Sequence, residues 1–560
     1  MNIIELAGAW RDQDPDDETR AELNLLIMDA QAGSPAALAD LHDRFDSRLQ
    51  FGTAGLRGKI GAGSNRMNRV LVSQAAAGFA QFLLGRAVSP SVVIGFDGRK
   101  NSRQFAIDTA ELMAGAGVRA VLLERMLPTP VLAFAVRELR VSAGIMVTAS
   151  HNPAEDNGYK VYLGDADEGS QIVAPLDGQI AAQILAVVAE KNVLHLARST
   201  DYQIADELVL DEYVRRTAAL AGSPRARLRY VYTALHGVGW ETAHRVFVAA
   251  GFGEPITVAS QIEPDPAFPT VAFPNPEEPG AMDLAFTTAI AADAEIVIAN
   301  DPDADRLAIG IPTGDGRWRR LSGNQVGALL GWRAAERLTA AAQNSTGSGG
   351  TLAASIVSSP ALAAIARDHG LKYVDTLTGF KWVSRVKNLS YGFEEALGYL
   401  VDPWKVRDKD GISAAVDFLA LACDLKAEGK TVTDRLNELD ERFGAFASAQ
   451  VSIRVTDLAE IPRIMAGLRA SPPQRLGSLT VQSIDDFADG FGALPASDIL
   501  RIWLDDGSRV IVRPSGTEPK LKIYLDAVSV DGDADKRQAT ASATIAMLES
   551  AVRQLLPAST

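Results

Sequence analysis

Three aspartates alternate along one short polar segment of the sequence, NDPDADR. Asp301, Asp303 and Asp305 crowd negative charge directly behind the apolar run EIVIA, and a bound hard cation would relieve that crowding. An EF-hand loop is excluded, because it needs glycine and glutamate where this chain has Arg306 and Pro312. The alternative is a solvated acidic turn. We predict a magnesium site, because Mg²⁺ takes oxygen ligands and leaves room for a phosphate oxygen.

A serine hydroxyl is the second candidate. Ser150 lies in TASHNP, directly after the apolar run at 142–148. Taken alone, this segment reads as an ordinary turn, because serine, asparagine and proline are common turn residues. With a metal loop as partner, Ser150 becomes a candidate nucleophile, which needs activation. In the earlier segment GFDGRKNS, we expect Asp97 and Arg99 to form a supporting ion pair.

The third candidate is a glycine-containing turn with cations on both sides, RPSGTEPKLK. Backbone N–H groups around Ser515, Gly516 and Thr517, together with the two hydroxyls, can cradle a phosphate. Arg513 adds a planar fork of donors. A plain hairpin turn is the alternative.

The elements around these segments predict an α/β protein. Strand patterns alternate with helical patterns in three successive runs, which is typical of βαβ units. Each run has a strand that ends in a polar loop: TASHNP, NDPDADR and GFEEA. Ligands of open α/β sheets bind beyond the carboxyl ends of strands, so we expect these loops to converge on one site. The end of the chain differs, with alternating strands around a helix and a closing amphipathic helix.

The predicted fold class is therefore α/β, with three similar α/β domains with mixed sheets plus a smaller C-terminal α+β domain. The predicted boundaries are an N-terminal helical extension at 1–50, domain 1 with the serine loop at 51–208, domain 2 with the metal loop at 209–315, domain 3 at 316–432 and domain 4 at 433–560.

Composition limits the functional classes. The chain has 560 residues, of which 47% are hydrophobic and 22% charged, as in a folded multidomain protein. A formal net charge of -15 argues against nucleic acid as a partner, so an anionic ligand needs a local positive patch. Cys423 is the one cysteine, which excludes an intrachain disulfide and fits a reducing compartment. Without a signal-like start or a long apolar stretch, we expect a cytoplasmic protein that does not contact a membrane.

The order and spacing of TASHNP, DPDADR, GFEEA and RPSGTEPK resemble the α-D-phosphohexomutases, the phosphoglucomutase and phosphomannomutase superfamily. The resemblance spans about Phe51 to Tyr524. Further segments, FGTAGLRG, TLTGFKW, GFEEALGY and KDG, resemble the branch that contains the second phosphoglucomutase type, phosphopentomutases and a glucose-1,6-bisphosphate synthase.

The resemblance implies a four-domain enzyme around a central cleft. Ser150 matches the serine that is phosphorylated in the active enzyme, and a phosphoserine oxygen completes the magnesium site of the three aspartates. Lys160 and Arg306 match basic residues near the reacting hydroxyl. His151, Arg57 and Lys381 match other positions in the cleft.

The resemblance also assigns the two ends of the substrate. Glu394 and Glu395 match the loop that hydrogen-bonds ring hydroxyls. The residues that match the loop for the non-reacting phosphate are Arg513, Ser515, Gly516 and Thr517. Ala396 departs from the pattern, because many relatives have serine there, so this loop does not define the preferred sugar.

We therefore predict a phosphosugar mutase that interconverts sugar 1-phosphates and 6-phosphates, with glucose or mannose as the sugar. The reaction passes through phosphoserine and a sugar 1,6-bisphosphate, which also serves as activator. The alternatives are a phosphopentomutase, a magnesium-dependent phosphatase with an aspartyl nucleophile, and a catalytically silent phosphosugar sensor. The phosphatase class expects a small or β-branched pair after its second aspartate, where this chain has Ala304 and Asp305. We expect a monomer or a dimer.

Overall fold

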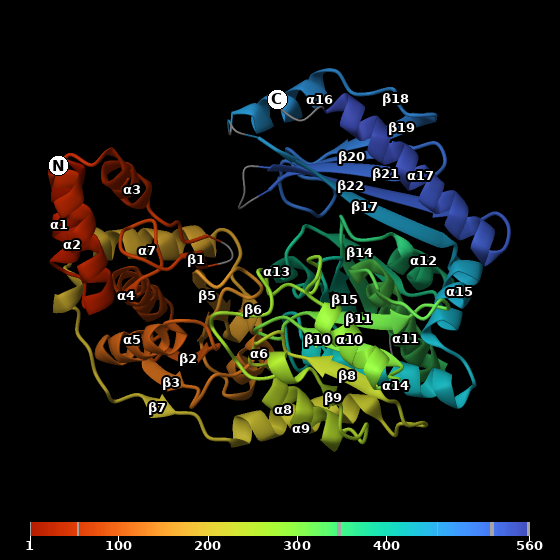
Figure 1. Ribbon diagram of the computed structural model, residues 1–560, viewed down its shortest axis with the longest axis horizontal. Helices are drawn as coiled ribbons and strands as arrows, with labels where there is room; N and C mark the ends of the chain where they lie inside the picture. Colours follow the sequence, from red (N-terminus) through yellow and green to blue (C-terminus); the bar gives the residue numbers. More distant parts are fainter. Residues whose placement is uncertain are drawn as a thin grey trace. The chain divides into compact units, whose positions relative to one another are not determined.

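The computed structural model describes residues 2–52, 55–343, 349–455, 457, 459–515 and 520–556. The chain forms two compact units (Figure 1). Unit 1 comprises Met1–Leu321 and Gly398–Asp424, and unit 2 comprises Ser322–Leu397 and Leu425–Thr560.

Unit 1 begins with a helical extension. Its helices are α1 (Ile3–Arg11), α2 (Asp17–Gln31) and α3 (Pro35–Phe45). Side chains at the three N-caps accept hydrogen bonds from the first turns, and Asn2 forms a capping box with Glu5. The helices bury a small apolar cluster around Leu23 and Leu41.

The first sheet has the order β1-β5-β4-β2-β3-β7, and β6 pairs with β5. The strands are β1 (Leu56–Lys59), β2 (Ser91–Phe96), β3 (Arg119–Leu122), β4 (Ala143–Val147), β5 (Asp156–Leu163), β6 (Ser170–Gln171) and β7 (Gln203–Ile204). β2 runs parallel to β3 and β4, whereas β5 is antiparallel to β4 and β1. Every residue of β2 is buried, as expected for a strand with helices on both faces.

Helices cover this sheet on both faces. They are α4 (Arg69–Arg86), α5 (Ser102–Gly115), α6 (Thr129–Glu138) and α7 (Leu176–Glu190). Ile94 packs with residues of α4 and α5 in one apolar core. On the opposite face of β2, a Cβ atom at Gly95 would meet Leu132 of α6.

The second sheet of unit 1 has the order β12-β11-β10-β8-β9. Its strands are β8 (Tyr230–Thr233), β9 (Ile256–Thr257), β10 (Ile296–Asn300), β11 (Leu307–Pro312) and β12 (Trp318–Arg320), and its helices are α8 (Leu208–Ala218), α9 (Gly239–Ala249) and α10 (Asp283–Ala291). β8, β9 and β10 are parallel, and β11 and β12 are antiparallel additions. β12 thus continues this sheet beyond the predicted boundary at 315. β16 (Gly398–Leu400) and most of α14 (Gly411–Ala427) also belong to unit 1.

Unit 2 contains a parallel arrangement in which β13 pairs with both β14 and β15. The elements are β13 (Thr351–Ser355), β14 (Lys372–Thr376), β15 (Leu389–Glu394), α11 (Gly323–Gln343), α12 (Ala361–Asp368), α13 (Phe380–Val383) and α15 (Val432–Phe443).

The remaining sheet of unit 2 is antiparallel, in the order β17-β22-β21-β20-β19-β18. Its strands are β17 (Ala445–Arg454), β18 (Arg475–Leu476), β19 (Leu479–Asp486), β20 (Leu500–Leu504), β21 (Arg509–Pro514) and β22 (Lys520–Ser529), and its helices are α16 (Glu460–Ala470) and α17 (Ala534–Leu555). Figure 1 shows α17 lying along this sheet. The predicted fold class, mixed α/β sheets followed by a C-terminal α+β part, is confirmed. Among the described residues, no helix has the length and apolarity to cross a bilayer.

Candidate active site

Three buried carboxylates follow the buried strand β10. The side chains of Asp301, Asp303 and Asp305 have no exposed surface, and one oxygen from each lies within 4.8 Å of the others. Ala304 adopts a left-handed φ of 55°, which turns the loop back on itself. Burial, together with the charges of Asp303 and Asp305, raises the pKa of Asp301 to about 8. The loop therefore requires cations.

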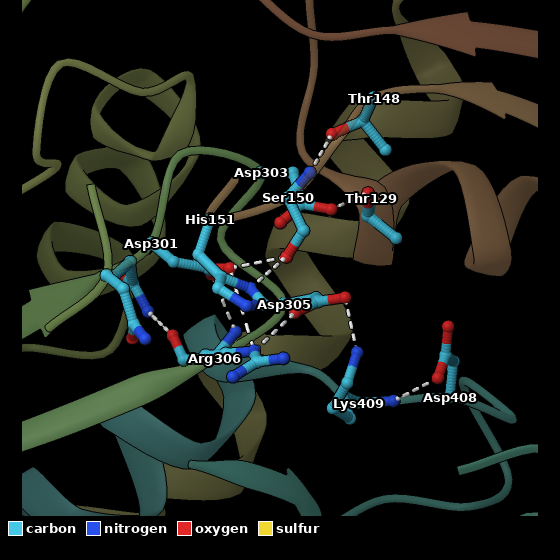
Figure 2. Close-up of polar contacts among 12 residues, drawn as sticks. Thr129, Thr148, Ser150, His151, Asp301, Asp303, Asp305, Arg306, Asp408 and Lys409 are labelled. Atoms are coloured by element: carbon cyan, nitrogen blue, oxygen red, sulfur yellow. Dashed lines mark hydrogen bonds and ion pairs between the residues drawn. The ribbon is translucent and has the colours of Figure 1, made fainter. Parts of the chain in front are cut away.

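Three cationic side chains face this loop (Figure 2, which labels Arg306 and Lys409). Lys160 Nζ donates to Asp303 Oδ2 at 2.7 Å and to Asp305 Oδ2 at 2.9 Å. Lys409 Nζ donates to the same oxygen of Asp305, and Arg306 Nε lies 3.9 Å from Asp305 Oδ1. Burial alone would raise the pKa of Asp305, but the charges of Lys160, Lys409 and Arg306 outweigh it and hold that pKa well below its usual range.

The loop retains oxygen atoms that suit a metal ion. Within the described chain, Asp303 Oδ1 and Asp305 Oδ1 are buried and have no hydrogen-bond partner. Buried carboxylate oxygens without partners are costly, and a hard divalent cation satisfies them. The three aspartates therefore fit a metal site built entirely from oxygen ligands.

Ser150, just beyond the end of β4, contacts the aspartate loop that follows β10. It follows β4, and it is nearly fully buried. Its N–H donates to Thr148 Oγ1 at 2.9 Å, and its Oγ donates to Asp301 Oδ2 at 2.8 Å. His151 Nδ1 lies 3.2 Å from the same Oγ (Figure 2). The predicted nucleophile and the predicted metal loop are thus in direct contact.

Two further predicted residues lie beside this serine. Burial and the positive charges of Arg306 and Arg57 hold the pKa of His151 well below its usual range, so its imidazole is neutral near pH 7. Arg57 on β1 donates to Asn152 Oδ1 at 3.2 Å. The structure therefore brings Ser150, Lys160, Arg306, His151 and Arg57 together around the aspartates.

Sequence reasoning missed two residues that touch the loop. Thr129, at the start of α6, donates from its hydroxyl to Asp303 Oδ2 at 2.6 Å and from its N–H to Asp303 O at 2.9 Å. From the sequence, Lys409 stood out only as part of the branch motif KDG. A lysine between two aspartates was the signal for Lys409, whereas a threonine before proline gave no signal for Thr129.

The neighbour of Lys409 explains how this lysine is held. Asp408 accepts hydrogen bonds from Tyr162 Oη at 2.8 Å and from Gln171 Nε2 at 2.7 Å. Asp408 and Tyr162 are fully buried. These bonds anchor the segment to β5 and β6, so Lys409 is presented by a fixed backbone.

In unit 2, the predicted sugar-binding carboxylates are fixed by hydrogen bonds. Glu395 Oε2 accepts from Ser358 Oγ at 2.9 Å and from Ser355 Oγ at 3.2 Å. Glu394, the last residue of β15, accepts from Gly379 N–H at 2.6 Å. Both residues are half-buried.

Arg513 lies in the same unit as these glutamates. It is near the end of β21 and is half-buried. Burial, and then the negative charge of Glu395, raise the pKa of Tyr524, while the positive charge of Arg513 and its hydrogen bond act against them. Arg513 and Glu395 thus both influence the pKa of Tyr524, so a cation and a carboxylate lie near the same tyrosine in unit 2.

The other predicted residues of unit 2 are placed as follows. Ser515 N–H donates to Lys520 O at 2.9 Å, which joins the end of β21 to the start of β22. Lys381 lies on α13 and is half-buried. Gly516 and Thr517 lie outside the described residues.

Comparisons with known proteins agree with this architecture. Residues 48–189, 211–314 and 322–443 match the phosphoglucomutase/phosphomannomutase alpha/beta/alpha domains I, II and III, and residues 451–543 match the C-terminal domain.

Two curated relatives cover most of this chain. A protein of Haemophilus influenzae named "Probable phosphomannomutase" is 54% identical over 84% of this chain and 95% of its own length. The phosphopentomutase of Mus musculus is 34% identical over 89% of this chain and 86% of its own length.

A solved structure shares the fold. The phosphoglucomutase/phosphomannomutase family protein from Burkholderia thailandensis superimposes with a TM-score of 0.70 at 22% identity, covering 92% of this chain and 99% of its own.

The fold and the domain matches define an isomerase of the phosphomutase type. This chain belongs to the phosphoglucomutase/phosphomannomutase family, in the α-D-phosphohexomutase superfamily.

Proposed function

We propose that this protein interconverts hexose 1-phosphates and hexose 6-phosphates, with glucose or mannose as the sugar, and that Ser150 carries the transferable phosphate. The supporting observation is the hydrogen bond from Ser150 Oγ to Asp301 Oδ2, which joins a strand-end hydroxyl to a buried aspartate loop. A solvated acidic turn would not be expected to make such a buried contact. A sugar 1,6-bisphosphate is both the intermediate and the compound that primes the serine.

In the forward transfer, the bond between phosphorus and Ser150 Oγ breaks as a bond forms between phosphorus and a sugar hydroxyl oxygen. The proton that the sugar hydroxyl releases is taken up by the serine alkoxide, so the transfer leaves no net proton in solution. His151 Nδ1, 3.2 Å from Ser150 Oγ, is placed to hold the proton of the serine. Lys160 and Arg306 supply positive charge beside the reacting oxygens. Phosphoryl transfer depends mainly on this positioning and charge neutralisation.

The metal of this site is Mg²⁺ in our proposal, held by Asp301, Asp303, Asp305 and the phosphorylated Ser150. When bound, it neutralises the charge that develops on the phosphoryl oxygens. The protein's contribution is to fix the carboxylates in advance, through Lys160 and Thr129.

The residues of unit 2 recognise the substrate in this proposal. Glu394 and Glu395 accept hydrogen bonds from ring hydroxyls in either orientation of the sugar. The residues proposed to bind the phosphate that is not reacting are Arg513, Ser515, Gly516 and Thr517, and Lys381 is a further proposed substrate contact. Arg57, on β1, is a further proposed substrate contact.

One assay series tests the substrate. The value of kcat/KM is measured for glucose 1-phosphate, mannose 1-phosphate, ribose 1-phosphate and deoxyribose 1-phosphate under one set of conditions. We expect a hexose phosphate to give the highest value and the 6-phosphate as product. A higher value for a pentose phosphate would favour phosphopentomutase, the activity named for the Mus musculus relative. Net release of inorganic phosphate would favour a phosphatase.

We expect phosphorylation of Ser150 to tighten metal binding by about tenfold or more. Lys160, Lys409 and Arg306 already face the three carboxylates of the loop, so a divalent cation adds unbalanced charge. A phosphate dianion on Ser150 restores the balance, and such coupling between two sites commonly reaches 5- to 150-fold. Calorimetric titration of Mg²⁺ into phosphorylated and unphosphorylated protein measures the effect. Equal affinities in the two forms would contradict this charge argument.

We expect Glu395→Gln and Arg513→Ala to change different kinetic properties of the enzyme. Glu395→Gln should change the ratio of kcat/KM between sugars, because its carboxylate is proposed to meet ring hydroxyls. Arg513→Ala should weaken every phosphosugar by a similar factor, on the order of 2 to 5 kcal/mol if the partner phosphate stays buried and unpaired. It should also let more bisphosphate escape between the two transfers.

Steady-state kinetics on the same four sugar phosphates, with assay of free bisphosphate, distinguish these outcomes. Tyr524→Phe is the matched control for the arginine, because it removes the hydroxyl that meets Arg513 and leaves the guanidinium. The division of roles is wrong if Arg513→Ala alters sugar preference as strongly as Glu395→Gln and releases no additional bisphosphate.

A further inference from the structure

Arg99 binds the backbone of the loop that carries Ser150. Its Nη2 donates to Ser150 O and to Asn152 O, both at 2.6 Å. Its Nη1 donates to Pro153 O at 2.7 Å and to Asp156 O at 3.1 Å. The side chain is 1% exposed. One buried guanidinium thus collects carbonyl groups along the whole turn from β4 to β5.

The guanidinium itself is held in place. Arg99 follows β2, and its Nε lies 3.5 Å from Asp97 Oδ2, so the expected ion pair is confirmed. Asp97 Oδ1 is fixed in turn by the N–H of Arg99 at 3.0 Å and by Ser102 Oγ at 2.6 Å. The ring of Phe268 lies over the guanidinium, 5.0 Å from Arg99 Cζ. These contacts leave Arg99 little freedom to follow a moving loop.

The loop needs such support because of the conformation of Ser150. Its φ is 51°, in the left-handed region that residues other than glycine rarely adopt. Such conformations persist where the surroundings enforce them, and they cluster at functional sites. Thr148 Oγ1 fixes the N–H of Ser150, and Arg99 fixes its carbonyl oxygen. These two restraints fix the direction of the Cα–Cβ bond, and the hydrogen bond to Asp301 Oδ2 fixes the rotation that places Oγ.

We infer that Arg99 is a positioning residue for phosphoryl transfer, which aims Ser150 Oγ at the aspartate loop by binding the carbonyl groups of its turn. This inference rests on the proposed role of Ser150 as carrier of the phosphate. It goes beyond a stabilising ion pair, because the contacts of Arg99 are with the nucleophile loop as well as with Asp97.

Lysine cannot replace this arginine. A guanidinium presents five N–H donors in a planar fork, whereas an ammonium group places three donors on one nitrogen. Arg99→Lys therefore keeps the charge opposite Asp97 and loses the ability to bind the turn from two nitrogens at once.

The test compares Arg99→Lys with Arg69→Lys. Arg69 makes a two-pronged contact with the buried Asp108, at 2.7 and 2.8 Å, and it does not touch the Ser150 turn. Thermal unfolding measures what each substitution does to stability. The rate of phosphate transfer from phosphorylated enzyme to sugar phosphate, per mole of phosphoserine, measures positioning.

We expect Arg99→Lys to lower that rate and kcat by about 100-fold, as a misplacement of about 1 Å does, with KM within about threefold of the parent. Arg69→Lys should leave kcat within about threefold even where it lowers the unfolding temperature. The inference is overturned if the two variants have the same kcat.

A second variant keeps the test decisive if Arg99→Lys does not fold. Arg99→Gln should recover transfer when guanidinium ion is added, whereas added guanidinium should not affect the parent. Folded Arg99→Gln that transfers phosphate at the parental rate would overturn the inference. Phosphopeptide mapping of the parent separates this failure from that of the proposed function, because a parent without phosphate on Ser150 refutes the latter.

Discussion

Ser150→Ala is expected to lower kcat by at least about 10³-fold, the largest effect of any single substitution considered for this chain. The alanine lacks the oxygen that would bind phosphorus, and no other hydroxyl is seen to share its contact with Asp301 Oδ2 among the described residues. Removal of a covalent nucleophile typically costs this much, because the surrounding charges cannot replace the intermediate.

Intact-mass measurement after incubation with a sugar 1,6-bisphosphate provides the check. The parent should gain one phosphate and Ser150→Ala none. Ser73→Ala is a matched control, because Ser73 is equally buried, on α4 of the same part of the chain, and does not touch the aspartate loop. Persistence of the added phosphate in Ser150→Ala would defeat the assignment.

Asp303→Asn is expected to weaken Mg²⁺ binding and to lower kcat by about 100-fold or more. Asp303 Oδ2 accepts from Lys160 and Thr129, while Oδ1 is buried without a partner. The asparagine amide has two orientations. In one, its NH₂ faces the donors Lys160 and Thr129; in the other, its NH₂ replaces Oδ1, the oxygen that would bind the cation. Either choice removes a carboxylate ligand, so orientation and neutralisation of the phosphoryl group fail together.

Activity measured against Mg²⁺ concentration, with calorimetric titration of the metal, follows both effects. Excess chelator should abolish the activity of the parent, and Mg²⁺ should restore it. Asp315→Asn is the control, because Asp315 is an exposed aspartate in the following turn, paired with Arg317. Full activity of the parent in excess chelator would rule out the metal-dependent account.

The metal loop of the candidate site could be predicted because its three aspartates lie close together in the sequence. Alternating aspartates directly after an apolar strand are a local pattern that indicates a metal site. Ser150 likewise follows an apolar strand. The contact between Ser150 and Asp301 could only be anticipated from the rule that ligand loops follow the carboxyl ends of strands.

The residues that were missed act across long separations. Thr129 meets Asp303 from 174 positions away, and Lys409 meets Asp305 from 104 positions away. Neither pairing can be read from the sequence, because tertiary packing alone brings these side chains together, although Lys409 does stand between two aspartates. Arg99 was interpreted as half of an ion pair, since the carbonyl groups that it binds have no signature in a sequence.

In the fold, too, the features that local sequence patterns encode could be predicted, and the features that depend on tertiary contacts could not. Strand and helix periodicity predicted the βαβ runs and the different C-terminal part, because those signals are local. The domain boundaries stay predictions; β12, a short half-buried strand that pairs with β11, begins just after the predicted boundary at 315. The segment Gly398–Asp424 follows β15 in the sequence but belongs to unit 1, which only its tertiary contacts reveal.

The central claim, that the phosphate on Ser150 is passed to the substrate, is tested most directly by a chase experiment. Enzyme labelled with ³²P from a sugar bisphosphate is mixed with unlabelled hexose phosphate and sampled within one turnover. Our account predicts that the label leaves Ser150 at a rate no slower than kcat and appears in sugar phosphates. It is contradicted if the label stays on the protein during turnover, or if it is released as inorganic phosphate.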